Sequence, residues 1–253
     1  MRITDKVALV TGGSRGIGRA ISRRLAEEGA RVAIADILED EARQTATEIV
    51  AAGGQALAVT TDVTQLDQVR ACVQHVTDTW GPVDILVNNA GWDRIEPFVE
   101  SSPETWDKVI AINLRGPINL CHTVAPQMME RKQGKIISIS SDAGRVGSTG
   151  EAVYSACKAG IIGFSKTLAR ELARSQVNVN VVCPGPTDTA LLQQVTQGER
   201  GARVIEAMTR AVPFRRLGQP EEIANAVAFF ASPDADFVTG QVLSVSGGLT
   251  MAG

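Results

Sequence analysis

Short apolar runs recur along the chain, and each is rich in β-branched residues. There are seven of them, at residues 6–12, 31–36, 55–62, 83–91, 135–141, 177–185 and 241–248. They are nearly continuous in apolar character and do not alternate with polar residues. This pattern is typical of parallel strands that are buried on both faces, so it predicts a seven-stranded parallel sheet.

Segments with helical spacing lie between these runs. They are predicted at about 16–28, 38–52, 66–80, 103–132, 151–174 and 221–230. Because strand and helix alternate without a break in composition, residues 1–253 are predicted to form one α/β domain. The expected architecture is a single doubly wound Rossmann fold with helices on both faces of the sheet.

Residues 186–218 depart from this alternation. They form a long, largely polar insertion that follows the sixth apolar run and precedes the last helix. Long insertions at the carboxyl end of a strand are often functional, so we predict a substrate lid here.

The overall composition is that of an ordinary globular protein, with 44% hydrophobic and 21% charged residues. A net charge of −3 provides no basic footprint for nucleic acid. No apolar run reaches the roughly 18 residues that a membrane span needs. The first residues enter a strand pattern without a signal-peptide core. We therefore expect a cytoplasmic protein without nucleic-acid or membrane partners.

The possible thiol and metal ligands are scattered. The four cysteines, Cys72, Cys121, Cys157 and Cys183, form no C-x-x-C motif. They are interpreted as reduced, mostly buried thiols of a cytoplasmic protein. Only two histidines are present, and they do not cluster with other ligands, so no metal site is expected.

The turn after the first apolar run, "VTGGSRGIGRA", contains Gly12, Gly16 and Gly18. Glycines allow the backbone to approach a pyrophosphate, and the N-terminus of the following helix favours its negative charge. The spacing differs from the G-x-G-x-x-G fingerprint. Asp36, at the end of the second run, could accept hydrogen bonds from both ribose hydroxyls of an adenosine. The alternative for Asp36 is a solvated aspartate at a strand end.

Two residues bear on the choice of cofactor. The carboxylate of Asp36 would repel a 2′-phosphate, which favours NAD over NADP. Arg15, in the glycine turn, could instead bind that phosphate. Like-charge repulsion excludes a ligand directly, whereas a surface arginine can turn away into solvent, so NAD is predicted.

The only tyrosine of the chain, Tyr154, lies one helical turn before Lys158. The two residues could simply be packed helix neighbours. Alternatively, the lysine charge lowers the phenol pKa from about 10, so that Tyr154 serves as a general acid and base. The pair by itself does not decide between these readings.

Together these motifs resemble the short-chain dehydrogenase/reductase family over nearly the whole chain. The resemblance is carried by "TGGSRGIG" at the glycine turn, "DV" at 62–63, "NNAG" at 88–91, Asn113, Ser141, the Tyr154–Lys158 pair and "PGPTDT" at 184–189. It implies an oxidoreductase that uses a nicotinamide dinucleotide.

The resemblance also implies the catalytic roles. Ser141 would position the substrate oxygen and Tyr154 would exchange a proton with it. Lys158 would lower the pKa of Tyr154 and hold the nicotinamide ribose. Asn113 would anchor a proton-relay water at a helix distortion, which Gly116 and Pro117 favour.

Cofactor contacts are implied in the same way. Asp62 and Val63 would flank the adenine, and Thr187 and Thr189 would bind the carboxamide and phosphates. The full expected set is Gly12, Ser14, Arg15, Gly16, Ile17, Gly18, Asp36, Asp62, Val63, Asn89, Ala90, Gly91, Tyr154, Lys158, Pro184, Gly185, Thr187 and Thr189.

Local stretches point to a substrate. "NNAGWD", "SDAGRVGSTGEAVY", "VVCPGPTDTALL" and the tail "FVTGQVLSVSGGLTMAG" resemble the 2-hydroxycyclohexanecarboxyl-CoA dehydrogenases of alicyclic acid degradation. The resemblance implies NAD-dependent oxidation of a cyclic 3-hydroxyacyl-CoA to the 2-oxo thioester. Arginines in or after the lid either meet CoA phosphates or belong to an ordinary charged surface: Arg200, Arg203, Arg210, Arg215 and Arg216.

Two alternatives stay open. One is a 3-oxoacyl-carrier-protein reductase, or another alcohol or ketone dehydrogenase of the same family; Asp36 disfavours the carrier-protein reductase, for which NADP is expected. The other is a dinucleotide-sensing protein without catalysis, which the intact Ser141, Tyr154 and Lys158 disfavour.

Surplus apolar residues on the helices expected at 103–132 and 151–174 suggest a contact with further subunits. In the resembled family such helices pack across a two-fold axis, so a homotetramer is predicted, with the apolar tail near a partner's active site. The competing explanation is that the extra apolar face lies under the lid.

Overall fold

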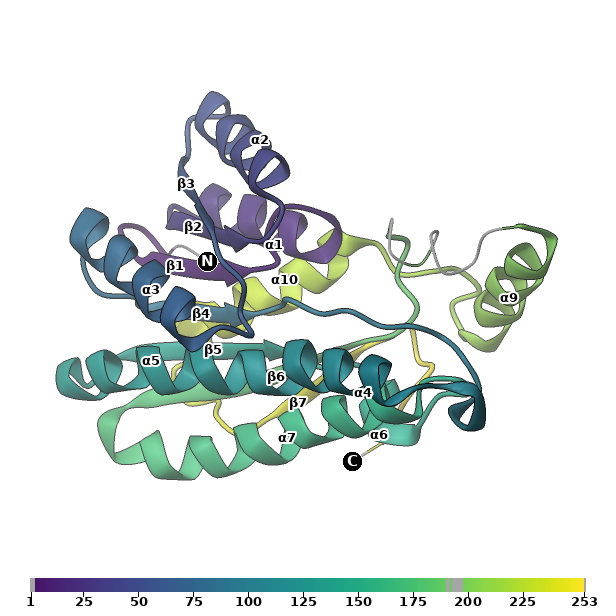
Figure 1. The fold of residues 1–253 in the computed structure, drawn as a ribbon. Helices are drawn as coiled ribbons and strands as arrows, with labels where there is room; N and C mark the ends of the chain where they lie inside the picture. The colour runs from purple at the N-terminus through teal and green to yellow at the C-terminus, as the bar shows by residue number, and fades with distance from the viewer. Residues whose placement is uncertain (1–2, 190–191, 193–197, 253) are drawn as a thin grey trace.

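The structure, a computed structural model, describes residues 3–189, 192 and 198–252. Its centre is one parallel sheet, in which every strand predicted from the apolar runs is present (Figure 1). The strands are β1 (Val7–Thr11), β2 (Arg31–Asp36), β3 (Gln55–Thr60), β4 (Ile85–Asn88), β5 (Gly134–Ile139), β6 (Val177–Pro184) and β7 (Val242–Val245). The prediction of a seven-stranded parallel sheet is confirmed.

The strand order is β3-β2-β1-β4-β5-β6-β7. The direction of winding reverses between β1 and β4, which lie side by side with Ala8 opposite Ile85 and Val10 opposite Val87. At such a reversal the connections leave in opposite directions, which opens a crevice beyond the carboxyl ends of the strands. Ligands of doubly wound folds bind in that crevice.

Helices cover both faces of the sheet, as predicted (Figure 1). One face carries α1 (Gly16–Glu27), α2 (Glu39–Ala51) and α10 (Pro220–Ala231). The other carries α3 (Leu66–Trp80), α5 (Gly116–Arg131) and α7 (Ala152–Leu172). Burial on both faces is the reason that the strands read as unbroken apolar runs.

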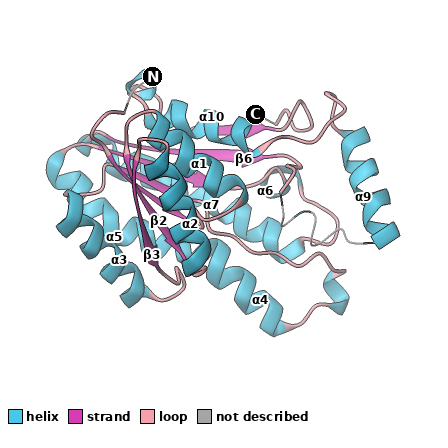
Figure 2. Cartoon of the chain, turned by 90° about the horizontal axis from the view of Figure 1, so that it is seen from above, coloured by secondary structure: helices cyan, strands magenta, loops and turns pink. Residues whose placement is uncertain are grey.

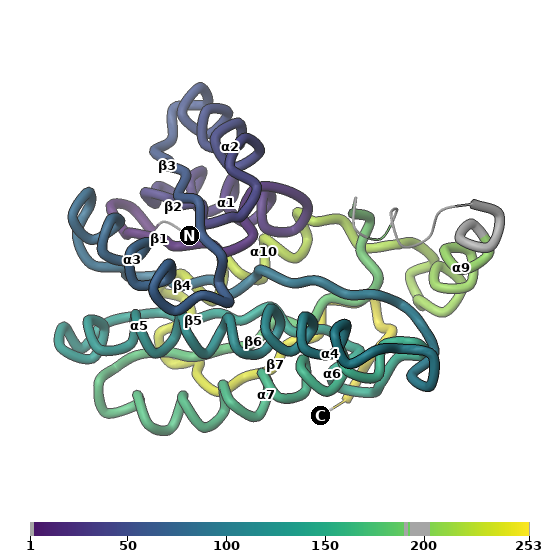
Figure 3. Tube along the Cα trace, viewed as in Figure 1, coloured from purple at the N-terminus to yellow at the C-terminus, as the bar shows by residue number. Residues whose placement is uncertain are grey.

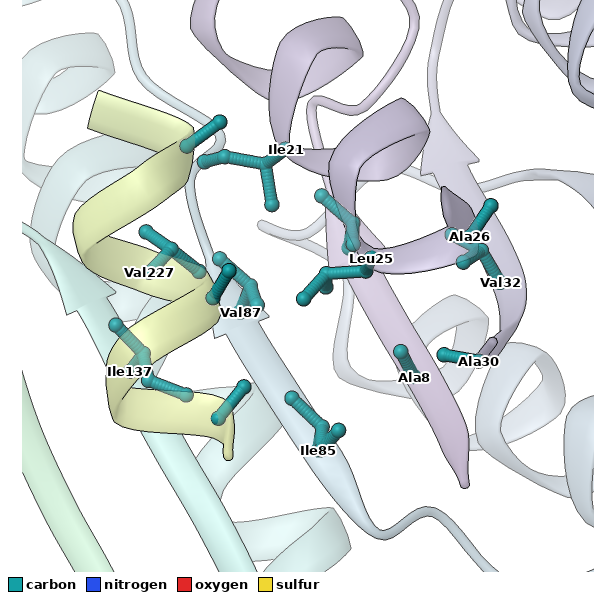
Figure 4. Close-up of a cluster of buried hydrophobic side chains, with 14 of the residues drawn as sticks. Ala8, Ile21, Leu25, Ala26, Ala30, Val32, Ile85, Val87, Ile137 and Val227 are labelled. Atoms are coloured by element: carbon teal, nitrogen blue, oxygen red, sulfur yellow. The ribbon is translucent and has the colours of Figure 1, made fainter. Parts of the chain in front are cut away.

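The core under α1 and α10 shows how the first face is packed (Figure 4). Ile21 and Leu25 of α1 and Val227 of α10 lie over Val87 of β4, and all four side chains are fully buried. This packing fixes the start of α1, and with it the glycine turn, against the middle of the sheet.

The helix predicted over 103–132 is interrupted, as the sequence suggested. The α4 helix (Pro103–Ile110) passes into a π-helical turn at Ala111–Arg115 and then into α5 (Figure 3). Pro117 has no N–H and cannot donate to the carbonyl of Asn113 four residues earlier. The ladder is therefore weakened at Asn113, and π-helical turns of this kind frequently mark functional sites.

Several elements were not predicted. A short helix, α6 (Ala143–Val146), follows β5, and 3-10 turns lie at Phe98–Glu100, Ala173–Ser175 and Pro233–Ala235. Within the segment predicted as a lid, α9 (Gly198–Ala211) stands beyond the sheet, at the end of the molecule (Figures 1 and 2). None of the helices in the described residues is long and apolar enough to cross a membrane.

Candidate active site

The side chain of Asp36 faces the glycine turn. Its carboxylate accepts hydrogen bonds from the backbone N–H groups of Ser14 and Leu38, each at 3.1 Å. The carbonyl of Ser14 accepts a further bond from the Thr45 hydroxyl of α2, at 2.8 Å. Asp36 is 7% exposed, so its charge is held in place at the end of β2.

The turn itself requires glycine. The backbone of Gly12 has φ +60°, and a Cβ added to Gly18 would lie 1.9 Å from the carbonyl oxygen of Gly12. Any side chain at position 18 would thus push the start of α1 away from β1. The glycines bring bare backbone to the crevice, as expected for a pyrophosphate site.

Asn89 supports this turn from the neighbouring strand. Its side-chain amide donates to the carbonyls of Thr11 at 3.0 Å and Gly12 at 2.9 Å. The hydroxyl of Thr11 accepts in turn from the backbone N–H of Asn89 at 3.0 Å. Asn89, expected to contact the nucleotide, therefore shapes the turn through its amide. Thr11 was missed, because a threonine that ends a buried strand gives no distinctive signal.

Three further residues expected to bind the cofactor follow the carboxyl ends of strands: Asp62 follows β3, and Thr187 and Thr189 follow β6. A Cβ on Gly16 would meet the Thr189 methyl group at 3.6 Å, so the segment after β6 lies across from the glycine turn. The Thr187 hydroxyl donates to the carbonyl of Gly185 at 2.9 Å. On the adenine side, Asp62 closes its own turn by accepting from the N–H of Thr64 at 2.9 Å.

The residues present fit a dinucleotide. The Ser14 hydroxyl is buried and has no hydrogen-bond partner among the described residues, although it lies in the turn that the Asp36 carboxylate faces. A buried hydroxyl without a partner is costly, and a ribose or phosphate oxygen would satisfy it. Ser14, Asp36 and the bare backbone of Gly12 would hold such a group.

On the other side of the crevice, α7 carries Tyr154 and Lys158. The ammonium of Lys158 lies 5.3 Å from the centre of the Tyr154 ring and donates to the carbonyl of Ile139 at 2.9 Å. Lys158 is 4% exposed. The Ser140 hydroxyl donates to the carbonyl of Lys158 at 2.8 Å, so this turn of α7 is tied to the end of β5.

Asn113 joins the same cluster from the π-helical turn. Its amide donates to the carbonyls of Trp92 at 2.6 Å and Val109 at 3.0 Å. A Cβ built on Gly91 would lie 3.0 Å from the Asn113 side-chain oxygen and 3.7 Å from the Lys158 nitrogen. Glycine at position 91 is what allows the two polar groups to approach each other.

The electrostatics differ from the expectation drawn from the sequence. Burial raises the pKa of Tyr154, and the charges of Glu151 and Asp93 raise it further, while a hydrogen bond with Ser141 acts in the opposite direction. Burial also lowers the pKa of Lys158 to about 8. In the chain by itself, desolvation disfavours the phenolate and outweighs any lowering by the Lys158 charge, so a lowered phenol pKa stays a prediction for the site that holds a positively charged nicotinamide. A raised pKa means that the Tyr154 phenol keeps its proton near pH 7.

A pocket opens beside Tyr154. Its wall is formed by the loop after β4, by α4 and by the start of α7, and includes Asp93, Phe98, Trp106, Val109, Glu151 and Tyr154. The rings of Phe98 and Trp106 stack with centroids 5.4 Å apart. The sequence did not identify these lining residues, because they come from three separate segments.

Metal ligands do not gather around this pocket. Among the described residues, no group of three or more His, Cys, Asp or Glu side chains could hold a metal ion.

Comparisons with known proteins agree with the fold. Residues 12–250 match the family described as enoyl-(acyl carrier protein) reductase. The chain is 41% identical over 251 residues to the 3-oxoacyl-[acyl-carrier-protein] reductase FabG of Vibrio cholerae, covering 99% of this chain and 100% of the relative. It is 38% identical to the enzyme of the same name from Thermotoga maritima, with the same coverage.

A solved structure is similar as well. A tryptophan variant of actinorhodin polyketide ketoreductase with NADPH superposes with a TM-score of 0.91 at 39% identity. The match covers 98% of this chain and 99% of the ketoreductase.

The fold and the site define an oxidoreductase that interconverts CH–OH and carbonyl groups with a dinucleotide cofactor. The chain belongs to the short-chain dehydrogenase/reductase family, as its motifs suggested.

Removing the Tyr154 hydroxyl tests its catalytic role. We expect Tyr154→Phe to lower kcat by roughly 10²–10⁴-fold, because only the proton-exchanging group is lost. Dinucleotide binding, followed by quenching of tryptophan fluorescence, and the circular dichroism spectrum should stay unchanged. A kcat within about tenfold of the unmodified enzyme would contradict this role.

Proposed function

We propose that this protein is an NAD-dependent oxidoreductase of 3-oxoacyl and 3-hydroxyacyl thioesters. The observation that carries the proposal is the placement of the Tyr154 phenol in the pocket wall, with the buried Lys158 nitrogen 5.3 Å from the centre of its ring. A proton donor of this kind is what the reduction of a ketone requires.

The chemistry follows from the side chains. In reduction, the Ser141 hydroxyl orients the carbonyl oxygen and Tyr154 passes its proton to that oxygen as hydride reaches the carbonyl carbon. The bound dinucleotide supplies the hydride in reduction and accepts it in oxidation. The Lys158 ammonium stabilises the resulting phenolate, and Asn113 holds the loop behind it. Oxidation of the alcohol is the reverse, with phenolate as the base.

The substrate class rests on the relatives together with the local stretches. The relatives are named 3-oxoacyl-carrier-protein reductases, which favours the alternative weighed from the sequence over the cyclic CoA thioester. Both are β-oxygenated acyl thioesters, and the reacting part is the same. We propose the 3-oxoacyl thioester as the substrate. The ring CoA thioester is the second candidate, supported by two of the resembling stretches: "GEAVY" lines the pocket, and so does Asp93, the last residue of "NNAGWD".

The lid arginines give limited support for a CoA partner. Arg210 pairs with Glu206 at 3.4 Å, and Arg216 pairs with Glu222 at 2.6 Å. Arg203 and Arg215 are exposed, and the Arg200 side chain lies outside the described residues. Because two of these guanidinium groups already face carboxylates, contact with CoA phosphates stays a hypothesis, as does the role of 186–218 as a lid.

A substrate panel tests the proposal. Turnover should be measured with 3-oxoacyl thioesters of acyl-carrier protein and of CoA, 2-oxocyclohexanecarboxyl-CoA, and simple ketones. We expect kcat/KM to be highest for one of the thioesters. A preference for a non-thioester ketone would refute the substrate class, and no turnover with any member would favour a dinucleotide-sensing role.

The cofactor preference depends on Asp36, because a carboxylate fixed at the crevice repels a 2′-phosphate. We expect NAD(H) to give the higher kcat/KM. Asp36→Ala should narrow the gap to NADP(H) by about tenfold or more, since removing even about 1.4 kcal/mol of repulsion has that effect. Asp40→Ala removes an exposed carboxylate of α2 and is the matched control. A higher kcat/KM of the unmodified enzyme with NADP(H) would mean that Arg15 dominates.

The assembly remains a proposal. Several apolar side chains of the π-helical turn, α5 and α7 are only half-buried in the single chain: Ile112, Leu114, Ile118, Ile162, Phe164 and Leu168. Near the tail, Met251 is 84% exposed, while the carbonyl of Ala252 accepts a hydrogen bond from Arg145 of the same chain. Surfaces of this kind favour a homotetramer whose tails reach a neighbouring subunit.

Light scattering at micromolar concentration should therefore give four times the mass of one chain. A monomeric mass together with full activity would refute both the interface and the role of the tail.

A cytoplasmic location is proposed as well, because the cysteines are all free and buried: Cys72, Cys121, Cys157 and Cys183.

A further inference from the structure

The loop after β4 is held at both ends. Asn113 bonds the backbone of Trp92 at one end, accepting its N–H at 3.4 Å and donating to its carbonyl at 2.6 Å. At the other end, the N–H of Glu96 donates to the carbonyl of Gly150 at 3.0 Å. Asp93 is therefore held in a loop that lies against Gly150, two residues before the start of α7.

The approach of the two segments is close. Gly150 has φ +82°, and a Cβ there would lie 2.9 Å from the Ile95 side chain. Glu151 follows directly and lies within hydrogen-bonding reach of Asp93. Both carboxyl groups line the pocket beside Tyr154.

One oxygen of Asp93, Oδ2, is buried and has no hydrogen-bond donor among the described residues. Two ionised carboxylates that interact directly repel each other, and burial strengthens the repulsion. A single proton between them removes one charge and also supplies the missing hydrogen bond. The geometry thus favours a pair that holds one proton.

We propose that Asp93 and Glu151 form a proton-sharing carboxyl pair in the wall of the substrate pocket, which acts through its charge to keep Tyr154 protonated. Both are positioning residues, because they act on the reaction through Tyr154. The inference rests on the proposed function only in taking Tyr154 as the group that exchanges the proton.

The charge balance around the pair supports this assignment. Burial and the neighbouring Glu151 raise the pKa of Asp93 to about 7. Arg94 is paired with Glu96 at 3.0 Å, and the Lys108 ammonium lies over the Trp92 ring at 4.0 Å.

Further titratable groups surround Tyr154. Burial raises the pKa of the Cys157 thiol, and that of Cys183 to about 11, so both thiols are neutral near pH 7. Lys158 is the cation that opposes the pair, and it lowers the pKa of Asp93 less than Glu151 raises it.

The pH dependence follows from these charges. The pair carries one negative charge while it holds the shared proton and two once that proton is lost. The second charge raises the cost of forming a phenolate, so Tyr154 keeps its proton as the pH rises. The pair therefore extends ketone reduction to higher pH and delays alcohol oxidation. Removing either carboxylate should therefore shift the loss of ketone reduction and the onset of alcohol oxidation to lower pH.

Infrared difference spectroscopy tests the shared proton without any substrate. The unmodified enzyme should show a protonated-carboxyl C=O band at pH 6 that disappears as the pH rises through about 7 to 8. Asp93→Asn should lack the band, and Glu151→Gln should lose it at lower pH. A spectrum without this band, or a band that persists in Asp93→Asn, would overturn the proposal.

The effect on Tyr154 can be read directly, because it is the only tyrosine of the chain. Ultraviolet absorption of the phenolate should appear at a pH lower by about one unit in Asp93→Asn and in Glu151→Gln. Glu104→Gln removes an exposed carboxylate at the start of α4 and should leave the onset unchanged. If phenolate absorption began at the same pH in the unmodified enzyme and in both pair variants, the coupling of the carboxyl pair to Tyr154 would be refuted.

With whichever substrate is turned over, the pH profiles of kcat should shift in the same direction and by a similar amount. Circular dichroism melts of the amide variants check that the fold is kept. The infrared and ultraviolet results hold whether or not a thioester is turned over, so failure of the substrate class and failure of the pair are separable.

Discussion

The shared direction of the strands is the constraint on which the rest of the structure depends. Because all the strands are parallel, their carboxyl ends meet at one edge of the sheet, and the winding reverses between β1 and β4. The side-chain amide of Asn89, just after β4, donates hydrogen bonds to the carbonyls of Thr11 and Gly12 at the end of β1. The glycine turn, Asp36 and the β4 loop therefore reach the same crevice although they are far apart in the chain.

Desolvation governs the chemistry of this crevice. Lys158 is nearly fully buried and is compensated by a carbonyl of β5, and burial brings its pKa down to about 8. The same burial, together with nearby carboxylates, raises the pKa of Tyr154. The lysine is thus better understood as a group that stabilises the phenolate once it forms than as one that produces it in advance.

The two sides of the crevice are built from different kinds of residues. The cofactor side is built from backbone and small residues, and these are the motifs by which the family is recognised. The pocket beside Tyr154 combines the β4 loop, α4 and the start of α7. Because the relatives match the chain along its whole length, they establish the reaction type. Asp93 and Glu151 both line that pocket.

The sequence by itself determined the sheet, its covering helices, the helix distortion at Asn113 and the family, because periodicity and ordered motifs are local signals. The same motifs nominated the candidate site residues, whose roles are proposals. Only the tertiary structure decided the sign of the Tyr154 pKa shift, the support that Thr11 and Asn89 give the glycine turn, and the meeting of Asp93 with Glu151. Each of these depends on burial or on contact between distant segments, and neither is encoded in local spacing.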